Sequence, residues 1–183
     1  NSQISVLCVL PSIVEFTYRC SSQISGPQFN LLYASFFKLI TSLNKNPNLK
    51  FTFRPGPSDS PLHKDIMQNL NIFNDIDISM SKNISSALEL HDLCIIFYPE
   101  TTVLDAVESN KPFIIYSDPK TYTYDTHFLS LVDNLASSKI LHYSFNSIYE
   151  FLVNISKPGL CSWWNSDNVS HSLELFQSNC LLK

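Results

Sequence analysis

Short apolar stretches alternate along this chain with longer segments in which apolar residues recur every three or four positions. Four stretches, at residues 4–10, 49–53, 93–97 and 113–116, are rich in apolar residues and are too short to be helices. They predict buried strands, bounded by Pro, Gly and Asn-rich turns. Shorter stretches at residues 76–78 and 139–143 predict two further strands.

The segments between these strands have the spacing of helices with one apolar face. The first helix is predicted to begin at Asn30, after a loop that runs from Tyr18 through Gly26-Pro27. Pro158 and Gly159 are expected to end the helix that Ser144 caps. The other helices are expected at residues 60–70, opened by Ser60-Pro61, and at 81–90, 101–110, 128–135 and 168–180.

Strands that alternate with helices in this way predict an α/β fold. The expected architecture is a Rossmann-like, doubly wound parallel sheet with helices on both faces. A length of 183 residues suits a single domain, so residues 1–183 are interpreted as one unit.

The segment from residue 92 to 119 has the most clearly marked boundaries. A buried strand leads into a turn at Tyr98-Pro99, after which Glu100 or Thr101 can cap a helix that ends near Asn110. Another buried strand follows. Parallel strands joined by a helix bind ligands beyond their carboxyl ends, where helix amides attract anions, so a binding site is expected near residues 98–102.

Composition excludes several classes of partner and location. A net charge of -4 without any Lys/Arg cluster argues against nucleic acid and anionic membranes as partners. No apolar stretch is long enough for a transmembrane segment, and no signal peptide pattern is present. The five cysteines are interpreted as reduced, with Cys8 and Cys94 packed in core strands, and a cytoplasmic location is expected.

The sequence offers no motif for a cofactor or a metal. Three glycines cannot form a dinucleotide fingerprint or a phosphate loop, and the five histidines lack the spacing of zinc ligands. Asp75-Ile76-Asp77 resembles an Asp-x-Asp metal pair but begins a short strand, so it is interpreted as a turn. No cofactor is expected, and no catalytic base is nominated.

Arg54 is the strongest candidate contact for an anion. It ends a strand and enters the rigid Pro55-Gly56-Pro57 loop, where it either contacts an anionic ligand or pairs with Asp59 at the surface. Arg19 is a weaker second cation. Thr101 and Thr102 are helix caps whose amides and hydroxyls can also bind a phosphate.

Two loop tyrosines, Tyr122 and Tyr124, are also candidates for the site. They either stack on a base or pack on their own domain.

Three motifs together resemble a known family. These are Arg54-Pro55-Gly56-Pro57, the segment from Asp92 to Ala106, and the strand from Lys111 to Tyr116. They are similar to the carboxyl-terminal half of GT-B glycosyltransferases, most of all bacterial surface-carbohydrate enzymes such as capsule polysaccharide and CDP-glycerol transferases. The resemblance implies that Arg54-Pro55 and Thr101-Thr102 contact the nucleotide diphosphate of a donor.

Two positions complete the comparison with this family. Asp105 stands where the family often has Glu. Glu100 stands where the family usually has Ser, and its carboxylate would repel a diphosphate unless it faces ribose or sugar hydroxyls instead.

The resemblance implies one half of a metal-independent transferase for bacterial envelope polysaccharide, capsule included. Its partners would be a UDP-, CDP- or GDP-linked sugar and an upstream acceptor domain of the same protein, without which the isolated half is expected to be inactive. Two alternatives remain open. One is a non-catalytic module that keeps the fold and holds a partner protein, and the other is half of a sugar-nucleotide epimerase.

Overall fold

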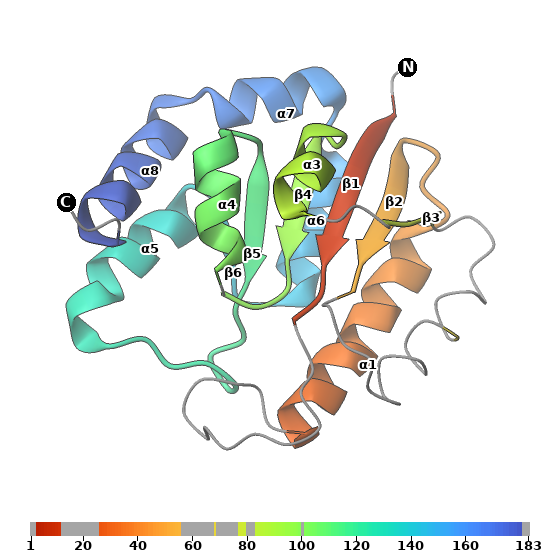
Figure 1. Cartoon of the computed structure of the whole chain (residues 1–183), viewed down its shortest axis with the longest axis horizontal. Coiled ribbons are helices and arrows are strands. Elements are labelled where there is room, and N and C mark those ends of the chain that lie inside the picture. The colour runs from red at the N-terminus through yellow and green to blue at the C-terminus, as the bar shows by residue number, and fades with distance from the viewer. Residues whose placement is uncertain are drawn as a thin grey trace.

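The computed structural model describes residues 3–11, 26–55, 68, 77–79, 83–99 and 101–180, apart from the side chains of residues 26–29 and 180. Its centre is a six-stranded parallel sheet (Figure 1). The strands are β1 (Ile4–Val9), β2 (Leu49–Arg54), β3 (Asp77–Ile78), β4 (Leu93–Ile96), β5 (Phe113–Tyr116) and β6 (Leu141–His142). Their order is β3-β2-β1-β4-β5-β6, and each neighbouring pair is parallel. The predicted doubly wound sheet is therefore confirmed.

Helices cover both faces of this sheet. Buried residues of α1 (Gly26–Leu43) and α6 (Phe145–Asn154) pack on one face. The other face is covered by α3 (Ile84–Glu89), α4 (Thr102–Ser109), α5 (Leu129–Ser137) and α8 (Asp167–Cys180). A short 3-10 helix, η1 (Thr126–Phe128), precedes α5, and α7 (Lys157–Trp164) crosses the top of Figure 1, at the end of the sheet where β1 begins.

The core divides in two because successive side chains of a strand point to opposite faces. Val6 and Cys8 belong to one buried cluster and Leu7 to the other. Phe36 of α1 lies edge-on to Phe53 and to Phe97, with ring centres 5.0 and 4.8 Å apart. Cys8 and Cys94 are buried and free, as their place in core strands predicted.

One carboxylate fastens the amino ends of the strands together. Asp92 Oδ2, just before β4, accepts hydrogen bonds from the Ser5 amide, the Ser5 hydroxyl and the Lys157 ammonium, each at 2.9 Å. Burial alone raises the pKa of Asp92, but these donors outweigh it and bring the pKa below its ordinary value. The contact joins β1, β4 and α7.

Several predicted boundaries were wrong. The first helix begins at Gly26 rather than Asn30, which suits Pro27 because proline is favoured in a first helical turn. The third helix begins at Ile84, since Asn83 caps it by accepting from the Ser86 amide at 2.8 Å. The sixth strand is limited to Leu141 and His142.

Pro158 and Gly159 do not end a helix. The sixth helix stops at Asn154, and Pro158 and Gly159 lie in the first turn of α7. The Ser156 hydroxyl caps that turn by accepting from the Gly159 amide at 3.2 Å. Proline is tolerated there because the first amides of a helix have no intrahelical partner. The predicted helix opened by Ser60-Pro61 falls outside the described residues.

Within the described part of the chain, no helix is both long enough and apolar enough to span a bilayer.

Candidate functional site at the carboxyl edge of the sheet

All strands end at the same edge of the sheet, which lies toward the bottom of Figure 1, where the arrowheads point. We call it the carboxyl edge; its described residues are 10–11, 54–55, 97–99, 117–118 and 143. The order of the strands reverses between β1 and β4, because β2 and β3 lie on one side of β1 and the later strands on the other. In open α/β sheets, ligands bind beyond the strand ends at this reversal.

Arg54 and Pro55 lie at this edge, as predicted. Val9, the last residue of β1, is in register with Arg54 on one side and with Ile96 on the other. The Arg54 carbonyl accepts from the Leu10 amide at 3.1 Å, so the chain stays paired to the end of β2. Two strand spacings, about 10 Å, separate Arg54 from the end of β4 at the backbone. The side chain of Arg54 is half-buried.

Thr101 and Thr102 lie at the start of α4, on the same edge. Thr101 is the cap residue, and its carbonyl accepts from the Leu104 amide at 2.9 Å. Its side chain makes no capping hydrogen bond and is exposed, contrary to the plain capping role considered above. The exposed Thr101 side chain therefore lies at the positive end of the helix dipole, where an anion is stabilised.

The structure thus brings Arg54, Pro55, Thr101 and Thr102 to one edge. The cavity beside Thr101 does not include Arg54 among its lining residues, so a shared pocket remains a prediction. Asp105 follows in the first turn of α4, and its amide lies 3.4 Å from the Thr101 carbonyl. Arg19 and Glu100 fall outside the described residues.

A tyrosine cluster covers the neighbouring strand ends. Tyr98 lies edge-on to Tyr122 at 5.4 Å, and Tyr122 lies edge-on to Tyr124 at 4.7 Å. Burial, partly offset by the Ser117 hydroxyl, raises the pKa of Tyr124 to about 12, so this phenol is a hydrogen-bond donor at neutral pH. These contacts favour the packing alternative for Tyr122 and Tyr124.

Asp118, which was not predicted from the sequence, shapes the turn after β5. Its carboxylate accepts from the Lys120 amide at 2.8 Å, and its carbonyl accepts from the Thr121 amide at 2.9 Å. The Tyr116 phenol, 3.4 Å from Asp118 Oδ2, has a raised pKa because of burial and of this negative charge. An Asp-Pro pair directly after a buried strand was the available signal, because strand ends of this kind form the edge.

Ser117, also missed, is a buried polar group at the same strand end. It is 2% exposed, and its hydroxyl finds no partner of hydrogen-bonding geometry in the described part of the chain. It lines a small cavity of about 10 Å³ with Phe97 and Tyr98. That volume suits one water molecule or one ligand hydroxyl. A buried hydroxyl that borders such a cavity can be satisfied by a bound water molecule.

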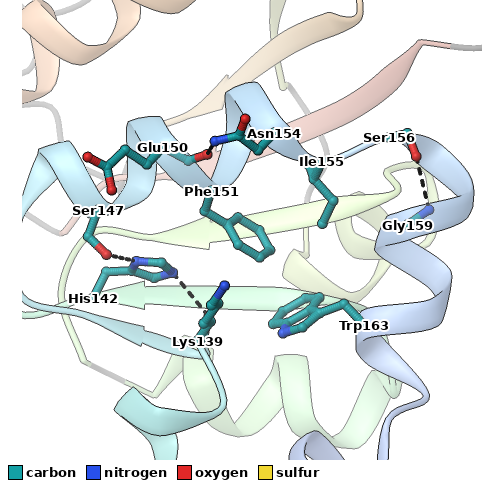
Figure 2. Close-up of a pocket in the computed structure, with 10 residues that line it drawn as sticks. All are labelled: Lys139, His142, Ser147, Glu150, Phe151, Asn154, Ile155, Ser156, Gly159 and Trp163. Atoms are coloured by element: carbon teal, nitrogen blue, oxygen red, sulfur yellow. Dashed lines mark hydrogen bonds between the residues drawn. The ribbon is translucent and has the colours of Figure 1, made fainter.

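A second cavity, of about 480 Å³, lies between β6, α6 and α7, away from the strand reversal (Figure 2). His142 forms its wall. His142 Nε2 lies 3.0 Å from the Lys139 carbonyl, which can only accept, so Nε2 carries the proton. Nδ1, 2.7 Å from the Ser147 hydroxyl, therefore accepts. Burial lowers the pKa of His142 to about 4, so the ring is neutral and both nitrogens are occupied. This arrangement is structural rather than catalytic.

No curated protein sequence matches this chain at a significant level. A family model described as LIC12162 family transferase matches residues 1–182, which is nearly the whole chain. The chain belongs to the LIC12162 family of transferases. Membership in a transferase family favours an enzyme over the non-catalytic alternative.

Several solved structures share the fold of this LIC12162 family member. They include spinosyn rhamnosyltransferase SpnG (TM-score 0.53, 14% identity, 97% of this chain and 41% of that chain). TarM gives a TM-score of 0.52 at 13% identity, over 94% of this chain and 32% of that chain. The structure described as trehalose-6-phosphate from E. coli, bound with UDP-2-fluoro glucose, gives a TM-score of 0.50 at 11% identity. It covers 97% of this chain and 44% of that chain.

The chain therefore spans less than half the length of each of these three proteins. At this identity the likeness establishes the fold, so the expected resemblance to GT-B glycosyltransferases is confirmed for the fold, and the family model shows a transferase.

Proposed function

We propose that this chain is the donor-binding half of a glycosyltransferase of the LIC12162 family, which binds a nucleotide-sugar and works with an acceptor domain of the same protein. The observation that carries the proposal is the start of α4 at the strand reversal, where the Thr101 side chain makes no capping hydrogen bond. Helix amides and the hydroxyls of Thr101 and Thr102 lie there on the same edge as Arg54. A diphosphate presents the negative charge that such a site stabilises.

Each group has a role in this proposal. The amides and hydroxyls at the start of α4 bind one phosphate, and the Arg54 guanidinium binds the other by charge-assisted hydrogen bonds. Both stabilise the charge that develops on the departing nucleotide diphosphate, as helix termini and basic side chains do in such reactions. Asp105 and Glu100 are the proposed contacts to ribose or sugar hydroxyls, Pro55 fixes the backbone beside Arg54, and Arg19 is a second cation.

Known proteins support the chemistry. The E. coli protein of the same fold is bound with UDP-2-fluoro glucose, and SpnG is titled a rhamnosyltransferase. We further propose, from the resemblance to capsule and CDP-glycerol enzymes, a role in bacterial envelope polysaccharide assembly. A cytoplasmic site of action is part of the proposal, and the free cysteines Cys8, Cys94 and Cys161 are compatible with a reducing compartment.

Calorimetry of the protein with UDP-, CDP- and GDP-sugars tests the proposal. At least one should bind, and Arg54→Ala should weaken it about 10- to 100-fold, the range for hydrogen bonds to a charged group. The matched control is Lys50→Ala, because Lys50 is a cation near the amino end of the same strand, paired with Asp77 at 2.7 Å. No binding to any of the three nucleotide classes, or equal affinities in Arg54→Ala and Lys50→Ala, would contradict it.

A further inference from the structure

Several helices of this protein begin with a capping side chain, but α4 does not. The side chains of Asn83, Ser144 and Ser156 each accept a hydrogen bond from a first-turn amide, at the starts of α3, α6 and α7. The Thr101 side chain at the start of α4 makes no such bond. Because the first amides of a helix have no intrahelical partner, α4 lacks a fastening that those three helices have.

The ring of Tyr122 packs on the turn that leads into α4. Its centre is 5.4 Å from that of Tyr98, and the two ring planes meet at 87°. Tyr98 directly follows Phe97, whose amide donates to a carbonyl of β1 at 3.1 Å. Tyr122 also lines the cavity beside Thr101, together with Pro99. The contact therefore joins the loop after β5 to the turn in front of α4.

The loop that carries Tyr122 is itself fixed to the sheet. The Asp118 carbonyl accepts from the Thr121 and Tyr122 amides, each at 2.9 Å, and from the Thr121 hydroxyl at 3.1 Å. The Ser117 amide, one residue earlier, donates to a carbonyl of β6 at 3.0 Å. The ring of Tyr124 lies 4.7 Å from that of Tyr122. Tyr122 is thus held at its backbone and at its ring.

We propose that Tyr122 is a positioning residue for the anion site at the start of α4. Its ring takes the place of a capping contact and holds the turn in the conformation that presents Thr101 and Thr102. The Thr101 hydroxyl is then not needed for capping. The inference rests on the proposed donor-binding function, because the ligand at this site is the donor diphosphate. A ligand that meets an ordered turn is spared the cost of ordering it, so Tyr122 raises affinity without touching the ligand.

Amide hydrogen exchange tests this support without any ligand. The reporter is the Leu104 amide, which donates to the Thr101 carbonyl at 2.9 Å and closes the first turn of α4. Tyr122→Leu removes the aromatic contact and should speed exchange of this amide about 2- to 10-fold, the worth of one edge-on ring pair. The Cys94 amide, 2.9 Å from the Pro112 carbonyl, reports on the sheet and should exchange as in the wild type.

Two further variants separate the ring contact from other effects. Tyr122→Phe keeps the ring, so its Leu104 amide should exchange at the wild-type rate. Tyr149→Leu is the matched control, because it makes the same change at a 39% exposed position on α6 and should leave exchange at Leu104 unchanged. Equal acceleration at Leu104 and Cys94 in Tyr122→Leu would mean that Tyr122 stabilises the whole fold. That result, or no acceleration at Leu104, would overturn the inference.

Calorimetry with UDP, CDP and GDP adds a readout of the site itself. For a nucleotide that binds the wild type, Tyr122→Leu should weaken binding about 2- to 10-fold, and Tyr122→Phe should keep the wild-type affinity. Unchanged affinity in Tyr122→Leu would contradict a positioning role, and equal weakening by both variants would show that the Tyr122 hydroxyl contacts the ligand instead. If no nucleotide binds the wild type, the proposed function fails, whereas exchange at Leu104 still decides whether Tyr122 holds the turn.

Discussion

The buried neutral His142 makes a quantitative prediction about acid stability. Its pKa in the folded protein is about 4, against about 6.5 in an unfolded chain. Between these values the unfolded chain binds a proton that the folded protein does not, so unfolding is favoured as the pH falls. The contribution of neutral His142 to the free energy of unfolding is therefore fully present above pH 6.5. It is lost as the pH falls from 6.5 toward 4.

The size of the effect follows from the two pKa values. Since one pKa unit corresponds to about 1.4 kcal/mol, linkage predicts a loss of about 2 kcal/mol between pH 7.5 and pH 5 and an upper limit of about 3 kcal/mol at lower pH. His142 is 3% exposed, so little solvent screening reduces this value. Acid also protonates Asp92 and exposed groups, which changes the free energy of unfolding as well. These changes occur equally in a variant that lacks His142, so the comparison with that variant cancels them.

Denaturant unfolding of the wild type and of His142→Gln at pH 7.5, 6 and 5 isolates the effect. The wild type should lose about 2 kcal/mol more than the variant over this interval. His171→Gln, an exposed position on α8, is the matched control and should follow the wild type. An imidazole pKa near 6.5 for His142 by NMR, or parallel stability curves for wild type and His142→Gln, would refute the reasoning.

Three further substitutions test packing and hydrogen bonding by denaturant unfolding at pH 7.5. Ser147→Ala removes the hydrogen-bond partner of His142 Nδ1 and should cost about 1 kcal/mol, whereas a cost near zero would show that this hydrogen bond contributes little to stability. Phe36→Ala empties a fully buried aromatic site and should cost about 3–5 kcal/mol; a loss below 1 kcal/mol would show that the site collapses freely. Asp92→Asn should cost about 1–3 kcal/mol and remove part of the acid sensitivity, whereas unchanged stability would mean that the contact with Lys157 contributes little.

Sequence pattern predicted the sheet well because buried parallel strands are continuous apolar stretches. The strand from Phe113 to Tyr116 was predicted with its exact bounds, because Pro112 precedes it and a polar turn follows it. The helix start at Thr101 and Thr102 was found for the same reason, because it directly follows a buried strand.

Boundaries set by local chemistry were harder to predict. A Pro-Gly pair ends helices more often than it opens them, and only the hydrogen bond from the Gly159 amide to Ser156 shows that α7 begins there. Gly26-Pro27 was likewise predicted to be part of a loop, whereas both residues lie in the first turn of α1.

Site residues that act through tertiary contacts could not be read from the sequence. The Tyr98–Tyr122 contact joins two loops that follow different strands, and the isolation of the Ser117 hydroxyl depends on every neighbour around it. Arg54 and Thr101 were predictable because each follows a strand directly, but whether they share one ligand depends on side-chain directions that spacing does not determine.

The most direct test of the central claim is a nuclear magnetic resonance titration of the labelled protein with UDP, CDP and GDP. The account predicts that, for at least one of them, the largest shifts occur at the Thr101 and Thr102 amides and at the Arg54 guanidinium, at the carboxyl edge. Shifts that concentrate instead around His142 and Trp163, in the cavity of Figure 2, or that are absent for all three nucleotides, would contradict it.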